Sequence, residues 1–138
     1  MADRTEHGAS QRGSTKDPDS GSLDISALQL RLRELANARD WEQFHSPKNL
    51  AMALAGEAGE LLEIFQWLSE VQSSDLDDED RDRVAEEMAD IQIYLLRLAD
   101  VLALSLPAAI EGKIVDNERK YPVGESKGNP TKYSRRSR

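Results

Sequence analysis

Cysteine is absent from this chain of 138 residues, and histidine occurs only twice, as His7 and His45. The absence of cysteine excludes disulfides, thiolate zinc sites and cysteine nucleophiles. Two histidines do not supply a Ser-His-Asp triad here, nor the paired Glu-x-x-His motifs of a di-iron carboxylate bundle. The chain also lacks a glycine-rich phosphate loop and a dinucleotide-binding fingerprint, so those nucleotide folds are excluded.

Positive charge and long apolar runs are scarce as well. Lysine and arginine number 18 against 26 aspartates and glutamates, which gives a net charge of -8. An acidic chain lacks the broad cationic face that displaces counterions from a phosphate backbone, so we expect no nucleic-acid binding. No apolar run approaches the roughly 20 residues that span a bilayer, and the polar start has no signal-peptide core. We therefore expect a soluble, cytoplasmic protein with no membrane partner.

The distribution of apolar and charged residues divides the chain into three parts. Residues 1–22 are polar, without periodic apolar positions, and are expected to form a disordered tail. Residues 23–125 carry apolar residues at helical spacing and are long enough for one domain with a core. Residues 126–138 are basic, and we expect an irregular tail there.

Four helices are predicted in the central part, where no segment shows strand-like alternation. The first ends near residue 40, the second runs from 47 to about 69, the third follows an acidic stretch over 73–82 and runs to about 104, and the fourth spans about 105–121. The apolar face of the second helix comprises Leu50, Leu54, Leu61, Ile64, Phe65 and Leu68. The apolar face of the third comprises Val84, Met88, Ile91, Leu95, Leu98 and Leu102. These patterns predict an all-α bundle of about four helices.

Carboxylates interrupt the apolar faces of the two longest helices. Glu57 and Glu60 are three residues apart and share one helix face, and Glu87 and Asp90 repeat this spacing on the third helix. Carboxylates that converge between facing helices repel one another unless a cation lies between them. Mg²⁺ prefers such hard oxygen ligands, and the small residues around Gly59 leave room for it. A single pair of this kind is more often a solvated helix face, but two pairs on separate helices favour a metal site.

The few aromatic residues are grouped around the second helix. Trp41, Phe44 and His45 precede it, and Trp67 follows it. Such side chains can stack on a nucleobase and offer a hydrogen bond to its edge. Trp41 and Phe44 could equally form a hydrophobic staple over the helix start, and a histidine in a loop is often plain surface.

Basic and amide groups gather on the fourth helix. Lys113 and Asn117 are four residues apart and share a face, so they could bind phosphate oxygens. The alternative is that Lys113 and the later Arg119 and Lys120 are solvated cations near a helix C-terminus, where positive charge is favourable.

Taken together, these motifs resemble the all-α MazG-like nucleotide pyrophosphatases over about residues 24–133. The resemblance is carried by the paired E-x-x-E and E-x-x-D motifs, the W-x-x-x-H before them, and the K-x-x-x-N and Y-P after them. Within that family the chain is most similar to enzymes that act on dCTP, although the linker over 69–83 departs from theirs in composition and length.

The resemblance implies roles for individual residues. It implies that the Mg²⁺ ligands are Glu57, Glu60, Glu87 and Asp90. It implies that the substrate is bound by Trp41, His45, Trp67, Tyr94, Lys113 and Asn117. It also implies a homo-oligomer, either a tetramer or a dimer.

The predicted function is therefore Mg²⁺-dependent hydrolysis of a (deoxy)nucleoside triphosphate to the monophosphate and pyrophosphate, which serves nucleotide pool sanitation. The resemblance implies dCTP or a modified dCTP as the substrate. A carboxylate that the metal does not fully occupy could take the proton of the attacking water, and Glu60 or Glu63 is the candidate. The alternative is a non-catalytic helical-bundle interaction protein whose acidic face binds a divalent ion.

Overall fold

A computed structural model describes residues 23–135, all of whose regular structure is helical. The elements are α1 (Ile25–Asn37), η1 (Glu42–Phe44), α2 (Pro47–Phe65), α3 (Glu70–Ser73), α4 (Asp78–Val101), α5 (Leu106–Lys120), α6 (Val123–Ser126) and η2 (Tyr133–Arg135), where η denotes a 3₁₀ helix. The all-α class and the four main helices, α1, α2, α4 and α5, are confirmed. The disordered tail expected over 1–22 and the last residues, 136–138, lie outside the described residues.

Side-chain caps set where these helices begin. Ser46 accepts a hydrogen bond from the backbone N–H of Asn49, and Pro47 occupies the first turn of α2, which begins at residue 47 as predicted. Ser69 forms a capping box with Gln72, which starts the short helix α3. Helix α2 ends at Phe65 instead of continuing to residue 69, and Ser69 belongs to the next helix as its cap.

The acidic linker contributes more helix than the sequence pattern predicted. Asp77 caps α4 through the backbone N–H of Asp80, so the helix begins at Asp78. The first turn contains three acidic residues, whose negative charge is favourable beside the positive end of the helix dipole. The helix ends at Val101, three residues earlier than expected, and Ala103 then turns the chain with a φ of 52°.

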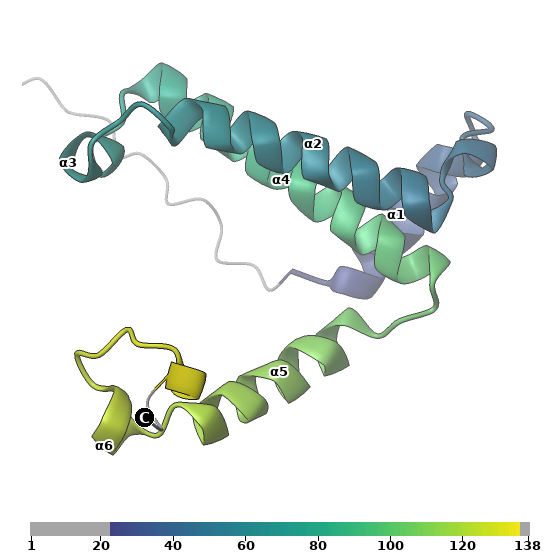
Figure 1. Cartoon of the computed structure of the whole chain (residues 1–138). Helices are drawn as coiled ribbons and strands as arrows, with labels where there is room; N and C mark the ends of the chain where they lie inside the picture. Colours follow the sequence, from purple (N-terminus) through teal and green to yellow (C-terminus); the bar gives the residue numbers. More distant parts are fainter. Residues whose placement is uncertain (1–22, 136–138) are drawn as a thin grey trace, which may run out of the picture.

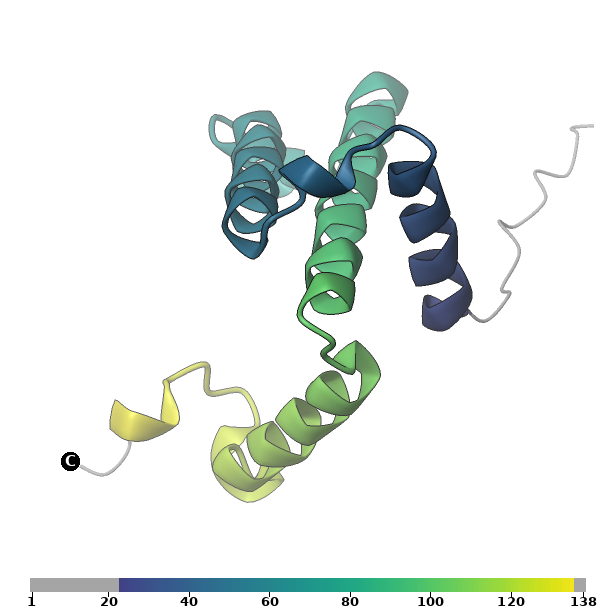
Figure 2. The ribbon, with the colours of Figure 1, turned by 90° about the vertical axis from the view of Figure 1, so that its right-hand side faces the viewer.

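Helix α4 is the centre of the packed part of the molecule. It runs antiparallel to α2 over most of its length, and α1 packs against its other side (Figures 1 and 2). The buried apolar residues of this three-helix layer are Ala36, Leu50, Ile64, Leu96 and Ala99. Two residues of the predicted apolar face of the third helix are exposed: Met88 is 58% exposed and Leu102, just after the end of α4, is 45% exposed.

Helix α5 leaves this layer and does not complete a compact four-helix bundle. It makes an angle of 105° with α4 and extends away from α2 and α4 (Figure 1). Ile110, Ile114 and Val115 of α5 are consequently exposed. The packed unit of one copy is therefore three helices, with the fourth projecting from it.

The C-terminal segment folds back on the end of α5. The ring of Tyr133 in η2 meets the ring of Tyr121 edge-on at 5.9 Å between centroids, and Lys120 lies 5.6 Å from the centre of the Tyr133 ring. Residues 127–132 form no helix, and the short helix η2 follows them.

None of the described helices is by itself both long enough and apolar enough to cross a membrane. The bent pair of α4 and α5 meets that requirement only when the two are added together, by length and composition alone.

Candidate active site

Carboxylates from α2 and α4 meet at the contact between these two helices. Glu57, Glu87 and Asp90 each offer an oxygen that lies within 4.8 Å of the oxygens of the other two. Glu57 and Glu87 are half-buried, and Asp90 is exposed. Three of the four predicted metal ligands are thus brought together, and both helices contribute.

The fourth predicted ligand, Glu60, lies close to this cluster without joining it. It is exposed and is not among the three residues whose oxygens come together. Its charge nevertheless acts on Glu87. Glu63, one turn further along α2, is also exposed and outside the cluster.

The electrostatics of the cluster are those of crowded negative charge. Burial raises the pKa of Glu87, and the negative charges of Glu60, Glu57 and Asp90 raise it further. A hydrogen bond with Glu57 acts in the same direction, because it forms with the protonated Glu87 carboxyl. A cation held among these oxygens would relieve the repulsion, so the cluster is consistent with a divalent metal site.

The glycines of α2 do not explain how the helices approach. A Cβ added at Gly56 or Gly59 would meet no heavy atom within 4 Å, so neither glycine is needed for contact between α2 and α4. The space next to both glycines is open within one copy of the chain.

A cavity of about 370 Å³ adjoins the cluster, with Asp90 as the residue common to both. Its walls come from α1, η1 and α4 and comprise Leu32, Leu35, Trp41, Phe44, His45, Asp90, Ile93, Tyr94 and Arg97. A volume of this size is in the range of small-molecule pockets, and apolar walls with a few polar groups are typical of them. Trp41 and Phe44 both lie on the cavity wall, next to the start of α2.

The structure distributes the six predicted substrate-binding residues over three places. Trp41, His45 and Tyr94 line the cavity. Trp67 lies beyond the opposite end of α2 from His45 and is 86% exposed. Lys113 and Asn117 lie on α5, which projects away from the carboxylates (Figure 2). Within one copy, these last three residues do not reach the cavity wall.

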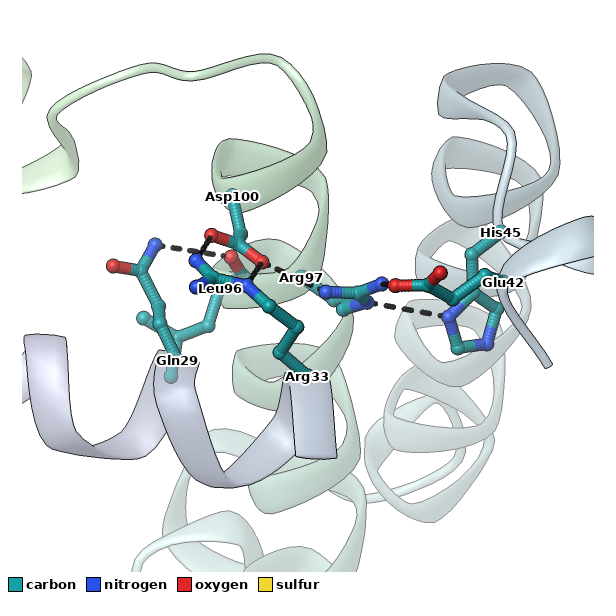
Figure 3. A network of polar contacts seen from close by, with 7 residues as sticks. All are labelled: Gln29, Arg33, Glu42, His45, Leu96, Arg97 and Asp100. Carbon is teal, nitrogen blue, oxygen red and sulfur yellow. Dashed lines mark hydrogen bonds and ion pairs between the residues drawn. The ribbon is translucent and has the colours of Figure 1, made fainter. Parts of the chain in front are cut away.

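A buried arginine on the cavity wall, Arg97, was missed by the sequence analysis. The Arg97 side chain donates from Nη1 to Asp100 at 2.7 Å and from Nε to Nδ1 of His45 at 3.3 Å, and Nη2 lies 3.5 Å from Glu42 (Figure 3). Arg33 of α1 donates to both carboxylate oxygens of Asp100. This network ties α1, η1 and α4 together around one wall of the cavity.

The network also shifts the pKa values of two of its members. The hydrogen bond from Arg33 is the main cause that holds the pKa of Asp100 below its ordinary value, and the positive charges of Arg33 and Arg97 add to it. Burial lowers the pKa of His45, and the neighbouring charge of Arg97 lowers it further, while Glu42 acts in the opposite direction.

One sequence signal pointed to this network. Arg97 and Asp100 are an opposite-charge pair three residues apart, inside the apolar segment 95–99 and its flank. Such pairs are common on helix surfaces, so the spacing does not by itself reveal burial. Glu42 and His45, which contact Arg97, and Arg33, which contacts Asp100, are distant in sequence from this pair, and only the packing of the helices brings them together.

Comparison with known proteins gives consistent results. The chain is 45% identical over 103 residues to dCTP pyrophosphatase 1 of Rattus norvegicus and 47% identical over 103 residues to that of Bos taurus. Each alignment covers 73% of this chain and 61% of the relative, so the chain spans about three fifths of the length of these curated relatives. The crystal structure of a pyrophosphatase from Archaeoglobus fulgidus superposes with a TM-score of 0.68 at 39% identity, over 77% of this chain and 99% of that one.

A model of the MazG-like family matches residues 53–135, which include both carboxylate motifs, α4 and α5. This match covers more than half of the sequence, and the chain therefore belongs to the MazG-like family.

Proposed function

We propose that this chain hydrolyses a (deoxy)nucleoside triphosphate, dCTP or a modified dCTP, to the monophosphate and pyrophosphate with Mg²⁺. The observation that carries this proposal is the position of three carboxylates within 4.8 Å of one another, beside an aromatic cavity that shares Asp90 with them. The relatives named dCTP pyrophosphatase 1 support the choice of base.

The donor set fits the metal that the family membership implies. Glu57, Glu87 and Asp90 supply hard carboxylate oxygens, with Glu60 next to them, and such oxygens are preferred by Mg²⁺. When bound, Mg²⁺ offsets the charge of the phosphate oxygens and the charge that develops on the leaving pyrophosphate.

The chain's own residues would orient the substrate and accept a proton. The base enters the cavity between Trp41 and Tyr94, which places its phosphates toward Asp90. The oxygen of a water attacks the α-phosphorus, the bond from that phosphorus to the oxygen bridging the β-phosphorus breaks, and pyrophosphate leaves. Glu60 accepts the proton of the water, because it is the exposed carboxylate nearest to the cluster without belonging to it. Glu63 is the second candidate for this role.

We also propose that the chain acts as a homo-oligomer, a dimer or a tetramer. Lys113 and Asn117 lie on the projecting helix α5, so in one copy they cannot bind phosphates held at the carboxylates. Their neighbours Ile110, Ile114 and Val115 are exposed apolar residues on the same helix. If α5 packs against a second copy, these apolar residues are covered and Lys113 can approach the partner's carboxylates.

The proposal is tested by measuring pyrophosphate release from a panel of deoxynucleoside and ribonucleoside triphosphates, each with Mg²⁺ and with EDTA. We expect Mg²⁺-dependent release, with the monophosphate as co-product and dCTP or 5-substituted dCTP as the preferred substrate. No release from any member of the panel, combined with divalent-ion binding, would instead support a non-catalytic protein with an acidic face.

A further inference from the structure

Arg97 is the one buried charged side chain in the part of the chain that the structure describes, with 6% of its surface exposed. Its charge is balanced locally, because Asp100 and Glu42 both contact the guanidinium. Nη1, Nη2 and Nε each face a different partner (Figure 3). An arginine engaged in this way is poorly placed to bind phosphate, although it lies on the cavity wall.

The contact with His45 determines which ring nitrogen carries the proton. An arginine Nε–H only donates, so Nδ1 of His45 must accept the hydrogen bond at 3.3 Å. A neutral imidazole has one donor and one acceptor nitrogen, and its proton is therefore on Nε2. The lowered pKa of His45, caused by burial and then by the charge of Arg97, keeps the ring neutral near pH 7.

We propose that Arg97 is a positioning residue that holds His45 in the Nε2–H tautomer, so that His45 donates a hydrogen bond to an acceptor on the base edge. This inference rests on the proposed function, since it concerns the same cavity. A cytosine-type base offers two such acceptors, the ring nitrogen N3 and the carbonyl oxygen O2. With Nδ1 engaged by Arg97, Nε2 is the ring nitrogen left for the ligand.

The tautomer can be measured without any turnover. Because the chain has two histidines, the variant His7→Asn leaves His45 as the single histidine for ¹⁵N NMR of the ring. We expect one tautomer with Nε2 protonated, and a shift of the Nε2 resonance when the product dCMP is added with Mg²⁺. A protonated Nδ1, a mixture of tautomers, or an Nε2 resonance that saturating dCMP leaves unchanged would overturn the proposal.

Variants of Arg97 test the positioning role. Arg97→Met in the same background removes the Nε–H, so we expect a mixture of tautomers and a KM for dCTP raised about tenfold, with kcat within about twofold. Arg33→Met is the matched control, since it removes the other arginine on Asp100 without touching His45, and it should keep the KM and the tautomer. A fall in kcat with an unchanged KM and tautomer in Arg97→Met would overturn the proposal.

A double-mutant cycle separates positioning from a merely structural role. Gln at position 45 carries an amide N–H close to the place of Nε2 and has no tautomer to select. We therefore expect Arg97→Met to have little further effect on KM when combined with His45→Gln. An equal effect of Arg97→Met in both backgrounds would contradict the positioning role. If no nucleotide is hydrolysed, the proposed function fails, while the NMR result still decides the tautomer.

Discussion

At the scale of residues, the carboxylate cluster of Glu57, Glu87 and Asp90 is the main feature of the candidate site. Glu57 and Glu87 face each other from α2 and α4, and Asp90 connects them to the cavity. Burial first, and then the acidic neighbours, raise the pKa of Glu87. The raised pKa means that the ionised form of Glu87 is less favourable here than in water. Removing one charge from this cluster should therefore reduce catalytic activity much more than it reduces the stability of the fold.

The first prediction concerns Glu57→Gln. We expect pyrophosphate release to fall by at least about 100-fold, because a metal ligand is lost. We expect the melting temperature in EDTA to stay level or rise, because one repelling charge is gone, and the stabilisation by added Mg²⁺ to shrink. Glu86→Gln, an exposed neighbour outside the cluster, is the control and should keep both properties. Normal turnover by Glu57→Gln would refute the metal assignment.

The second prediction concerns Asp100→Asn and its dependence on pH. At pH 7 the variant should lose about 2 kcal/mol of unfolding free energy, because the buried guanidinium of Arg97 loses its closest carboxylate. The folded-state pKa of Asp100 is lowered from 3.8, chiefly by the hydrogen bond from Arg33, so the ionised form stabilises the fold above the unfolded pKa. That contribution is lost as pH falls through the folded pKa.

Urea denaturation at several pH values checks this prediction. The stability gap between the wild type and Asp100→Asn should be full above about pH 4 and narrow at more acidic pH. The control is Asp116→Asn, which breaks an exposed ion pair with Arg119 and should change stability by less than about 0.5 kcal/mol. A gap that does not depend on pH would mean that Asp100 acts through its shape and not its charge.

At the scale of elements, local caps explain both the successes and the errors of the sequence analysis. The predicted start of α2 at residue 47 is correct, and there Ser46 caps the helix and Pro47 occupies its first turn. The cap at Ser69 was overlooked because the apolar pattern continues through Leu68, and the predicted second helix was therefore too long. The cap at Asp77 was hidden in a run of acids that looked like a linker.

The third prediction is that Ser46→Ala destabilises the protein by about 1 kcal/mol, because the backbone N–H of Asn49 loses its side-chain acceptor. Urea denaturation measures the change. Ser26→Ala is the same substitution in the first turn of α1, where Asp24 is the cap, and it should be neutral or slightly stabilising. Equal effects of the two changes would show that Ser46 does not act as a cap.

At the scale of the whole molecule, the projecting helix α5 is the main departure from a compact bundle. It carries Lys113 and Asn117 away from the carboxylates of the same copy and exposes Ile110 and Ile114. The sequence analysis placed this helix inside a four-helix bundle, whereas the described residues of one copy leave its apolar side chains exposed. This arrangement is the reason for proposing an oligomer with shared sites.

The fourth prediction uses mixed subunits. Glu57→Gln and Lys113→Ala should each be nearly inactive alone. After unfolding and refolding together in equal amounts, they should recover about a quarter of wild-type activity, because half of the dimers are mixed and each has one intact site. Pyrophosphate release measures the recovery, and a mixture of Glu57→Gln with Glu87→Gln is the control that should stay inactive. No recovery in the first mixture would contradict a site shared between copies.

The sequence by itself determined the helical class, the starts of α2 and α5, and the identity of the acidic motifs. These features depend on neighbours within about one helical turn, where caps, proline and apolar spacing act directly. Only the tertiary structure decided that Asp90 joins Glu57 and Glu87 while Glu60 stays outside, that Arg97 meets His45, and that α5 departs from the bundle. Contacts between helices depend on how they cross and on which side chains are covered, and no local pattern in one chain encodes that geometry.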